Sequence, residues 1–149
     1  MMKNAIILSA ALIAATVFPA CHEDGKKNIQ FGELPQQAQT FVNTHFADKQ
    51  VSVVYRDSEV GDNDYELLFT DGANIDFTKK GEWNEVEDRD ADGVPIAIMH
   101  QDIVNYVSTN FAGQYVVQIG KERNDFEVEL NNGVELVFDK NGQFLRHDD

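Results

Sequence analysis

The feature that most constrains the fold is that the chain repeats most of itself. From Leu34 onward, an apolar helical face is followed by strand-like alternation, and the same order returns 65 residues later, so that Phe46 corresponds to Phe111. Repetition of this kind indicates one supersecondary unit used twice, with neither copy able to bury its apolar face alone. We therefore expect two tandem copies of a single unit.

Each copy begins with a predicted amphipathic helix. Pro35 suits the first turn of such a helix, where a missing backbone N–H costs nothing. Apolar residues then recur at helical spacing and occupy one face. These residues are Leu34, Ala38, Phe41, Val42 and Phe46 in the first copy and Met99, Ile103, Tyr106, Val107 and Phe111 in the second. Each apolar face needs a sheet to cover it.

Four strands are predicted after each helix, because β-branched and aromatic residues alternate with polar ones. Asp71-Gly72 and Asn132-Gly133 predict two-residue hairpin turns of type I′. The predicted strands are 50–57, 64–70, 73–79 and 82–87, then 114–121, 125–131, 134–140 and 143–147. The predicted fold class is α+β, with two tandem α-β-β-β-β units, each a helix packed on a four-stranded antiparallel sheet.

Residues 1–20 have the pattern of a signal peptide. Lys3 precedes an apolar run, and the small residue Ala20 precedes Cys21. The run is shorter than the roughly 20 apolar residues that a transmembrane helix needs. The segment from Phe18 to Cys21 resembles a bacterial lipobox, which predicts lipidation of Cys21, and ordinary signal-peptidase cleavage is the alternative. We expect an exported periplasmic or outer-membrane lipoprotein, with surface display as a further option.

The rest of the chain divides into three predicted parts. Residues 21–31 are hydrophilic and predict a flexible tether. Residues 32–88 form the first unit and residues 89–149 the second. Cys21 is the only cysteine, so an intramolecular disulfide is excluded.

The chain is strongly acidic, with 26 acidic against 12 basic residues and a net charge of −14. Nucleic acids and anionic lipid surfaces attract basic proteins, so binding to either is disfavoured. Cations, basic protein surfaces and neutral ligands remain as partners. The alternative is that the acidity serves only solubility.

One helix on one sheet leaves the opposite sheet face uncovered. Strict alternation places scattered apolar residues among acids on that face. The predicted partner-binding residues are Val54, Glu66, Leu68, Val116, Glu129 and Val137. The alternative is plain solvation, since single exposed apolar residues are common.

Asp88, Asp90 and Asp92 precede Gly93 with the spacing that opens an EF-hand-type calcium loop. The twelfth position of such a loop is Met99, which carries no carboxylate, so the loop is not a complete EF-hand. The three aspartates predict a Ca²⁺ site, and Ca²⁺ is the one cofactor that the sequence indicates. The alternative is a plain acidic linker.

No catalytic pattern is recognisable in the chain. The histidines lack a second His or Cys at ligand spacing, and no nucleophile elbow is present. We therefore expect no enzymatic activity.

The combined pattern resembles the PepSY-like proteins, which are related in fold to β-lactamase inhibitory protein and common in the envelope of Bacteroides-type bacteria. The residues that carry the resemblance are Leu34-Pro35, Phe41-Val42, His45-Phe46, Asp64-Tyr65-Glu66 and the stretch from Asp71-Gly72 through Ile75-Asp76-Phe77 to Gly81-Glu82-Trp83. The second copy matches less well, having Met99-His100 in place of Leu34-Pro35.

The resemblance implies a combined sheet whose open face is concave, because in the inhibitor such a face grips a protein partner. It implies a non-catalytic binding or inhibitory module whose partner is an envelope protein or peptide, with proteases among the candidates. The alternative function is a calcium-responsive structural module, in which Ca²⁺ at Asp88, Asp90 and Asp92 fixes the angle between the two units.

Overall fold

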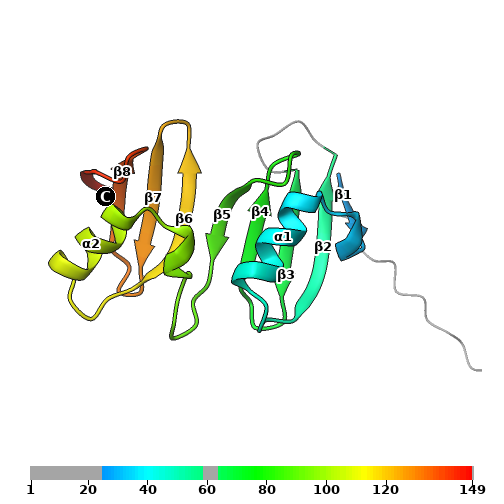
Figure 1. The fold of residues 1–149 in the computed structure, drawn as a ribbon, viewed down its shortest axis with the longest axis horizontal. Coiled ribbons are helices and arrows are strands. Elements are labelled where there is room, and N and C mark those ends of the chain that lie inside the picture. Colours follow the sequence, from blue (N-terminus) through cyan, green and yellow to red (C-terminus); the bar gives the residue numbers. More distant parts are fainter. Residues whose placement is uncertain (1–24, 59–63, 149) are drawn as a thin grey trace, which may run out of the picture.

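The computed structural model describes residues 25–58 and 64–148. The described strands form one antiparallel sheet in which they follow each other in chain order (Figure 1). The strands are β1 (Lys26–Ile29), β2 (Val51–Asp57), β3 (Tyr65–Phe69), β4 (Asn74–Phe77), β5 (Trp83–Glu87), β6 (Val116–Glu122), β7 (Asp125–Leu130), β8 (Glu135–Asp139) and β9 (Phe144–Asp148). The predicted signal peptide and Cys21 lie outside the described residues.

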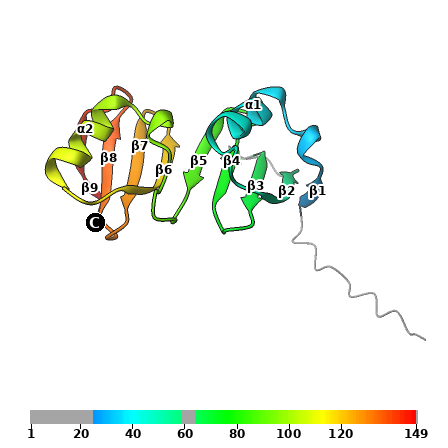
Figure 2. The ribbon, with the colours of Figure 1, turned by 60° about the horizontal axis from the view of Figure 1, so that its bottom comes forward.

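Both α-helices, α1 (Gln36–His45) and α2 (Gln101–Asn110), lie on the same side of the sheet (Figure 2). Each follows a short 3-10 helix, η1 (Phe31–Glu33) or η2 (Ile96–Ile98). Within the described residues, no helix has the length and apolar character needed to cross a membrane. The α+β class with two helix-covered halves is as predicted. The prediction of four strands in each unit is not accurate.

Each unit uses five strands, because β5 belongs to both. In the first unit β1 pairs with β2, which places Ile29 opposite Val54. In the second unit β5 pairs with β6 in the same way, which places Val86 opposite Ile119. Val54 and Ile119 correspond in the repeat, so β5 occupies the same position in the second unit as β1 occupies in the first. The sheet is therefore continuous across the junction.

The prediction of a flexible tether over residues 21–31 is wrong for Lys26–Ile29, which form β1. The strand was missed because Ile29 is its one buried side chain and the other three residues are polar. Pairing with β2 satisfies its backbone, and lysines are common on such edge strands. The first unit thus begins before residue 32.

β-Bulges occur at the same place in β2 and β6, between Val51 and Val53 and between Val116 and Gln118. A bulge places two residues of one strand opposite one residue of its neighbour, so in-and-out alternation is not continued across it. Val54 and Val116, predicted to lie on the open face, consequently face the helices and are only 2% and 5% exposed. The prediction of partner contact is wrong for both residues.

The hairpin turns are also different from those predicted. Gly72 donates its backbone N–H to Phe69, and Phe69 donates to Ala73, which encloses a three-residue loop. No residue other than glycine has a positive φ among the described residues, so type I′ turns, which require two such residues, are absent there. The loop at Gly133 has the same hydrogen bonds, from Gly133 to Leu130 and from Leu130 to Val134.

The two units pack their helices with equivalent aromatic trios. In each trio the helix ring meets one sheet ring edge-on, at 85° and 83°, and stacks on the other, at 25° and 10°. The trios are Phe41, Phe77 and Trp83 in the first unit and Tyr106, Phe138 and Phe144 in the second. Trp83 and Phe144 therefore pack against the core beneath the helices.

Candidate functional site

The open face is the side of the sheet opposite the helices, and no helix or strand among residues 25–58 and 64–148 covers it (Figure 2). Cross-strand register arranges its residues in two rows that run across the sheet. The first row is Asn28, Tyr55, Glu66, Asp76, Glu85, Gly120, Glu127, Val137 and Arg146. The second row is Val53, Leu68, Asn74, Glu87, Gln118, Glu129, Glu135 and Asp148.

Carboxylates stand directly opposite each other in the first row, where Glu66, Asp76 and Glu85 occupy β3, β4 and β5. Burial and then the charges of Glu66 and Glu85 raise the pKa of Asp76 to about 6, against an opposing effect of Lys26. Lys26 Nζ lies 2.8 Å from a Glu66 oxygen. Like charges in cross-strand contact are destabilising, so this row is not built for stability.

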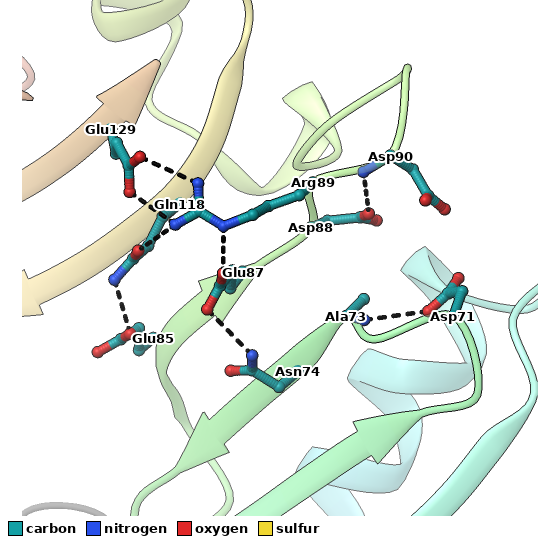
Figure 3. Close-up of polar contacts among 10 residues, drawn as sticks. All are labelled: Asp71, Ala73, Asn74, Glu85, Glu87, Asp88, Arg89, Asp90, Gln118 and Glu129. Atoms are coloured by element: carbon teal, nitrogen blue, oxygen red, sulfur yellow. Dashed lines mark hydrogen bonds and ion pairs between the residues drawn. The ribbon is translucent and has the colours of Figure 1, made fainter. Parts of the chain in front are cut away.

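Arg89 lies over the junction of the two units, reaching from the connector after β5 onto the open face (Figure 3). It pairs with Glu129 through two hydrogen bonds, from Nη1 at 3.0 Å and Nη2 at 2.8 Å, and its Nε donates to Glu87. The hydrogen bond from Arg89 lowers the pKa of Glu129. Such a forked pair fixes orientation as well as charge.

The network around Arg89 extends to its neighbours in the sheet. Gln118 Nε2 donates to Glu85 at 2.8 Å, and Asn74 Nδ2 donates to Glu87 at 3.2 Å (Figure 3). Together with Glu129, these residues connect β4, β5, β6 and β7. The open face is therefore ordered across the junction of the units.

A hollow of about 150 Å³ lies beside this network on the second unit. Gly120 is in its floor, and a Cβ atom added there would meet no atom within 4 Å. Tyr55 occupies the corresponding position in the first unit, where it lines a separate hollow of about 200 Å³ together with Lys26 and Asp76. The two hollows therefore differ in that Gly120 contributes no side chain to the one on the second unit. The carboxylates that line the hollow are Glu85, Glu122, Glu127, Glu129, Glu135 and Asp148.

The environment of the hollow disfavours negative charge. Burial, followed by the charge of Glu87, raises the pKa of Glu85. Burial, followed by the charges of Glu122 and Asp148, raises the pKa of Glu127. A raised pKa means that these carboxylates would gain from a nearby cation.

The acidic connector surrounds Lys49, in the loop after α1. Lys49 Nζ lies 3.0 Å from Asp88 Oδ2, 2.9 Å from Asp90 Oδ2 and 2.6 Å from Asp71 Oδ2. Burial acts to lower the pKa of Lys49, but hydrogen bonds to Asp71, Asp90 and Asp88 raise it above its usual value. Asp88 is the one buried charged residue in the described chain, and the ammonium group compensates it.

The predicted calcium ligands are not brought together as a group. Asp88 and Asp90 converge on Lys49, whereas Asp92 lines a separate hollow with Val94 and Met99. No group of three or more His, Cys, Asp or Glu side chains among the described residues is arranged to hold a metal ion. The sequence pattern did not include Lys49, because that residue lies far away along the chain.

The structure places the predicted partner-binding residues in three environments. Glu66, Leu68 and Glu129 lie on the open face, while Val54 and Val116 are in the core. Val137 belongs to the first row but is 0% exposed. Sequence reasoning missed Arg89 and Gly120, and the comparison of Gly120 with Tyr55 across the repeat was the signal for the latter.

Comparison with known proteins gives a consistent result. Residues 22–67 and 63–146 match the family described as "Putative beta-lactamase-inhibitor-like, PepSY-like". No protein of curated function matches the chain.

Solved structures with the same fold come from Bacteroides species. A "putative periplasmic protein from DUF2874 family" of Bacteroides vulgatus is 37% identical, with a TM-score of 0.78 over 85% of this chain and 99% of that one. A "putative calcium-regulated periplasmic protein" of Bacteroides thetaiotaomicron is 38% identical, with a TM-score of 0.78 over 83% and 97%. A second periplasmic protein of B. vulgatus, of unknown function, is 30% identical, with a TM-score of 0.76 over 84% and 100%.

Proposed function

Since this chain belongs to the PepSY-like family, we propose that it is a non-catalytic envelope module that binds a protein or peptide through the open face of its sheet. The observation that carries the proposal is the contrast between the two sheet faces. One face is covered by α1 and α2 (Figure 2). The other face presents two ordered rows of side chains, which cross-strand register places across the sheet. Broad faces of this kind are suited to protein contact.

Capture from an envelope extract tests this proposal. The immobilised mature chain is compared with a Leu68→Arg variant, since Leu68 is half-buried in the second row of the open face. A Gln37→Arg variant is the matched control, because it adds the same charge to an exposed position on α1. We expect Leu68→Arg to lose the captured proteins and Gln37→Arg to keep them. Equal capture by both variants would exclude the open face.

The proposed location is the periplasm or the periplasmic side of the outer membrane. The three relatives are described as periplasmic, and the sequence around Cys21 predicts a lipid anchor. Metabolic labelling with a fatty acid tests the anchor, with incorporation expected in the wild-type chain and lost in Cys21→Ser. Display on the cell surface is a finer alternative, which protease treatment of intact cells distinguishes.

A calcium-responsive module is the second candidate function. It is supported by the description of the B. thetaiotaomicron relative and by the contacts that Asp71, Asp88 and Asp90 each make with the ammonium group of Lys49. Ca²⁺ would have to replace the ammonium group of Lys49 at that position. Thermal unfolding with millimolar Ca²⁺ tests it, because a ligand that binds only the folded state raises Tm. An unchanged Tm in both wild type and Lys49→Met would dismiss this function.

A further inference from the structure

We propose that the hollow above Gly120 receives an arginine side chain of the partner. This inference rests on the proposed function, because it assigns the chemistry of the partner at the open face. Three observations lead to it, concerning the space, the charge and the geometry of the face.

The hollow differs from the one on the first unit because the repeat is broken at one position, where Gly120 stands in place of Tyr55. Gly120 pairs with Glu85 on β5 and Glu127 on β7, so it lies in the middle of the first row. The corresponding Tyr55 pairs with Asn28 and Glu66 in the first unit. The sheet is thus open at Gly120 to a side chain that comes from outside.

The charge of the hollow calls for a cation. Glu85 and Glu127 flank Gly120, and both have a raised pKa, to which burial contributes most. The nearby cations of the face pair elsewhere: Arg89 with Glu87 and Glu129, and Lys26 with Glu66. Arg146 stands at the rim, 4.0 Å from Asp148. The charge of Arg146 lowers the pKa of Glu127 and so offsets part of the increase. A basic side chain entering the hollow would complement the remaining carboxylates.

Arg89 shows which cation the face accommodates. Its guanidinium group is held by both oxygens of Glu129, and Glu129 also lines the hollow. The face therefore already binds one guanidinium group lying across neighbouring strands. In the first row Glu85 and Glu127 flank Gly120 in the same way that Glu87 and Glu129 flank Gln118 in the second row. A planar guanidinium group is better matched to paired carboxylates than an ammonium group.

A peptide titration followed by amide NMR tests the inference. The probe is a blocked pentapeptide of alanines with a central arginine, compared with analogues that carry citrulline or lysine. We expect the arginine peptide to shift the amide signal of Gly120 and its neighbours. The citrulline peptide should bind roughly 10-fold more weakly, because it lacks the charge. Equal binding of the citrulline or the lysine peptide would overturn the assignment to arginine.

Variants at residues that line the hollow distinguish the effect of filling its space from the effect of removing its negative charge. Gly120→Tyr introduces the residue of the first unit and should abolish binding, whereas Gly120→Ala should retain most of it, since nothing obstructs a Cβ atom there. Glu127→Gln should weaken binding several-fold, and Asp48→Asn, an equal charge change at an exposed position outside both rows, should not. Unimpaired binding by folded Gly120→Tyr would contradict the inference.

Failure of this inference can be told apart from failure of the proposed function. If Gly120→Tyr captures the same envelope proteins as the wild type while Leu68→Arg does not, the arginine assignment fails and the open face stands. If neither variant alters capture, the open face itself is excluded.

Discussion

Lys49 Nζ and Asp88 Oδ2 lie 3.0 Å apart, and their side chains are only 13% and 4% exposed. The contact joins the loop after α1 to the end of β5, where the connector between the units begins. Asp71 and Asp90 bind the same ammonium group from the solvent side. This cation therefore holds the acidic connector against the first unit.

Replacing Lys49 by methionine should destabilise the protein by about 2–3 kcal/mol, because it leaves the buried Asp88 without a compensating cation. Chemical denaturation measures the change in the free energy of unfolding. The hydrogen bond from Lys49 lowers the pKa of Asp71 below its usual 3.8. This part of the stabilisation is thus present above pH 3.8 and is lost as the pH falls through the lower folded value.

The control is Lys79→Met, which removes an equal charge from an exposed position. It should change the free energy of unfolding by less than about 0.5 kcal/mol. A similar decrease in the free energy of unfolding for both variants would show that Lys49 acts only through the net charge of the protein and not through its contact with Asp88.

Asp76→Asn should stabilise the protein at neutral pH and have little effect in acid. The folded pKa of Asp76 is about 6, above its usual 3.8, so the folded state holds the proton more firmly. Stability conferred by that proton is fully present below pH 3.8 and is lost as the pH rises towards 6. Asparagine removes this pH dependence. We expect a gain of about 1 kcal/mol at pH 7, reduced by solvent screening.

Denaturant unfolding of wild type and Asp76→Asn at several pH values checks this result. Asp48→Asn, at an exposed position, provides the baseline. A difference between Asp76→Asn and wild type that does not change between pH 4 and pH 7 would contradict the assigned cause.

Gly81→Ala should destabilise the first unit by more than about 2 kcal/mol. The residue has a φ of +85°, and a Cβ atom there would come within 2.7 Å of Pro35 Cβ and 2.9 Å of the Ala38 nitrogen. The start of α1 packs directly on this turn. Thermal unfolding measures the loss.

Gly72→Ala separates backbone strain from steric overlap. Gly72 has a φ of +97°, but no atom lies within 4 Å of the added Cβ. We expect it to cost about 1 kcal/mol, the usual penalty of a left-handed conformation alone. Equal losses at Gly81 and Gly72 would mean that close packing of α1 on the turn contributes nothing.

The repeat made most of the fold predictable. Helical spacing located α1 and α2, and alternation located β2 to β9 to within two residues, because both periods follow directly from local geometry. β1 was not predictable, because its single apolar residue, Ile29, gives no periodic pattern.

The candidate site was less predictable, because its residues depend on register. The bulges after Val51 and Val116 lie in apolar segments, where they do not change the sequence pattern. Strict alternation therefore assigned Val54 and Val116 to the wrong face of the sheet. Arg89 and Lys49 reach their partners across loops, which no local pattern records. By contrast, Glu66 and Glu129 lie beyond the bulges in regular strands, and their faces were assigned correctly.

The role of β5 as a strand of both units also determines how the molecule comes apart. Val86 is covered completely between the two halves, with Ile75 on one side and Ile119 on the other. Separating the halves would strip backbone partners from β5 and expose both apolar neighbours to water. Unfolding of one half therefore destabilises the other half, and the two units unfold as a single cooperative unit.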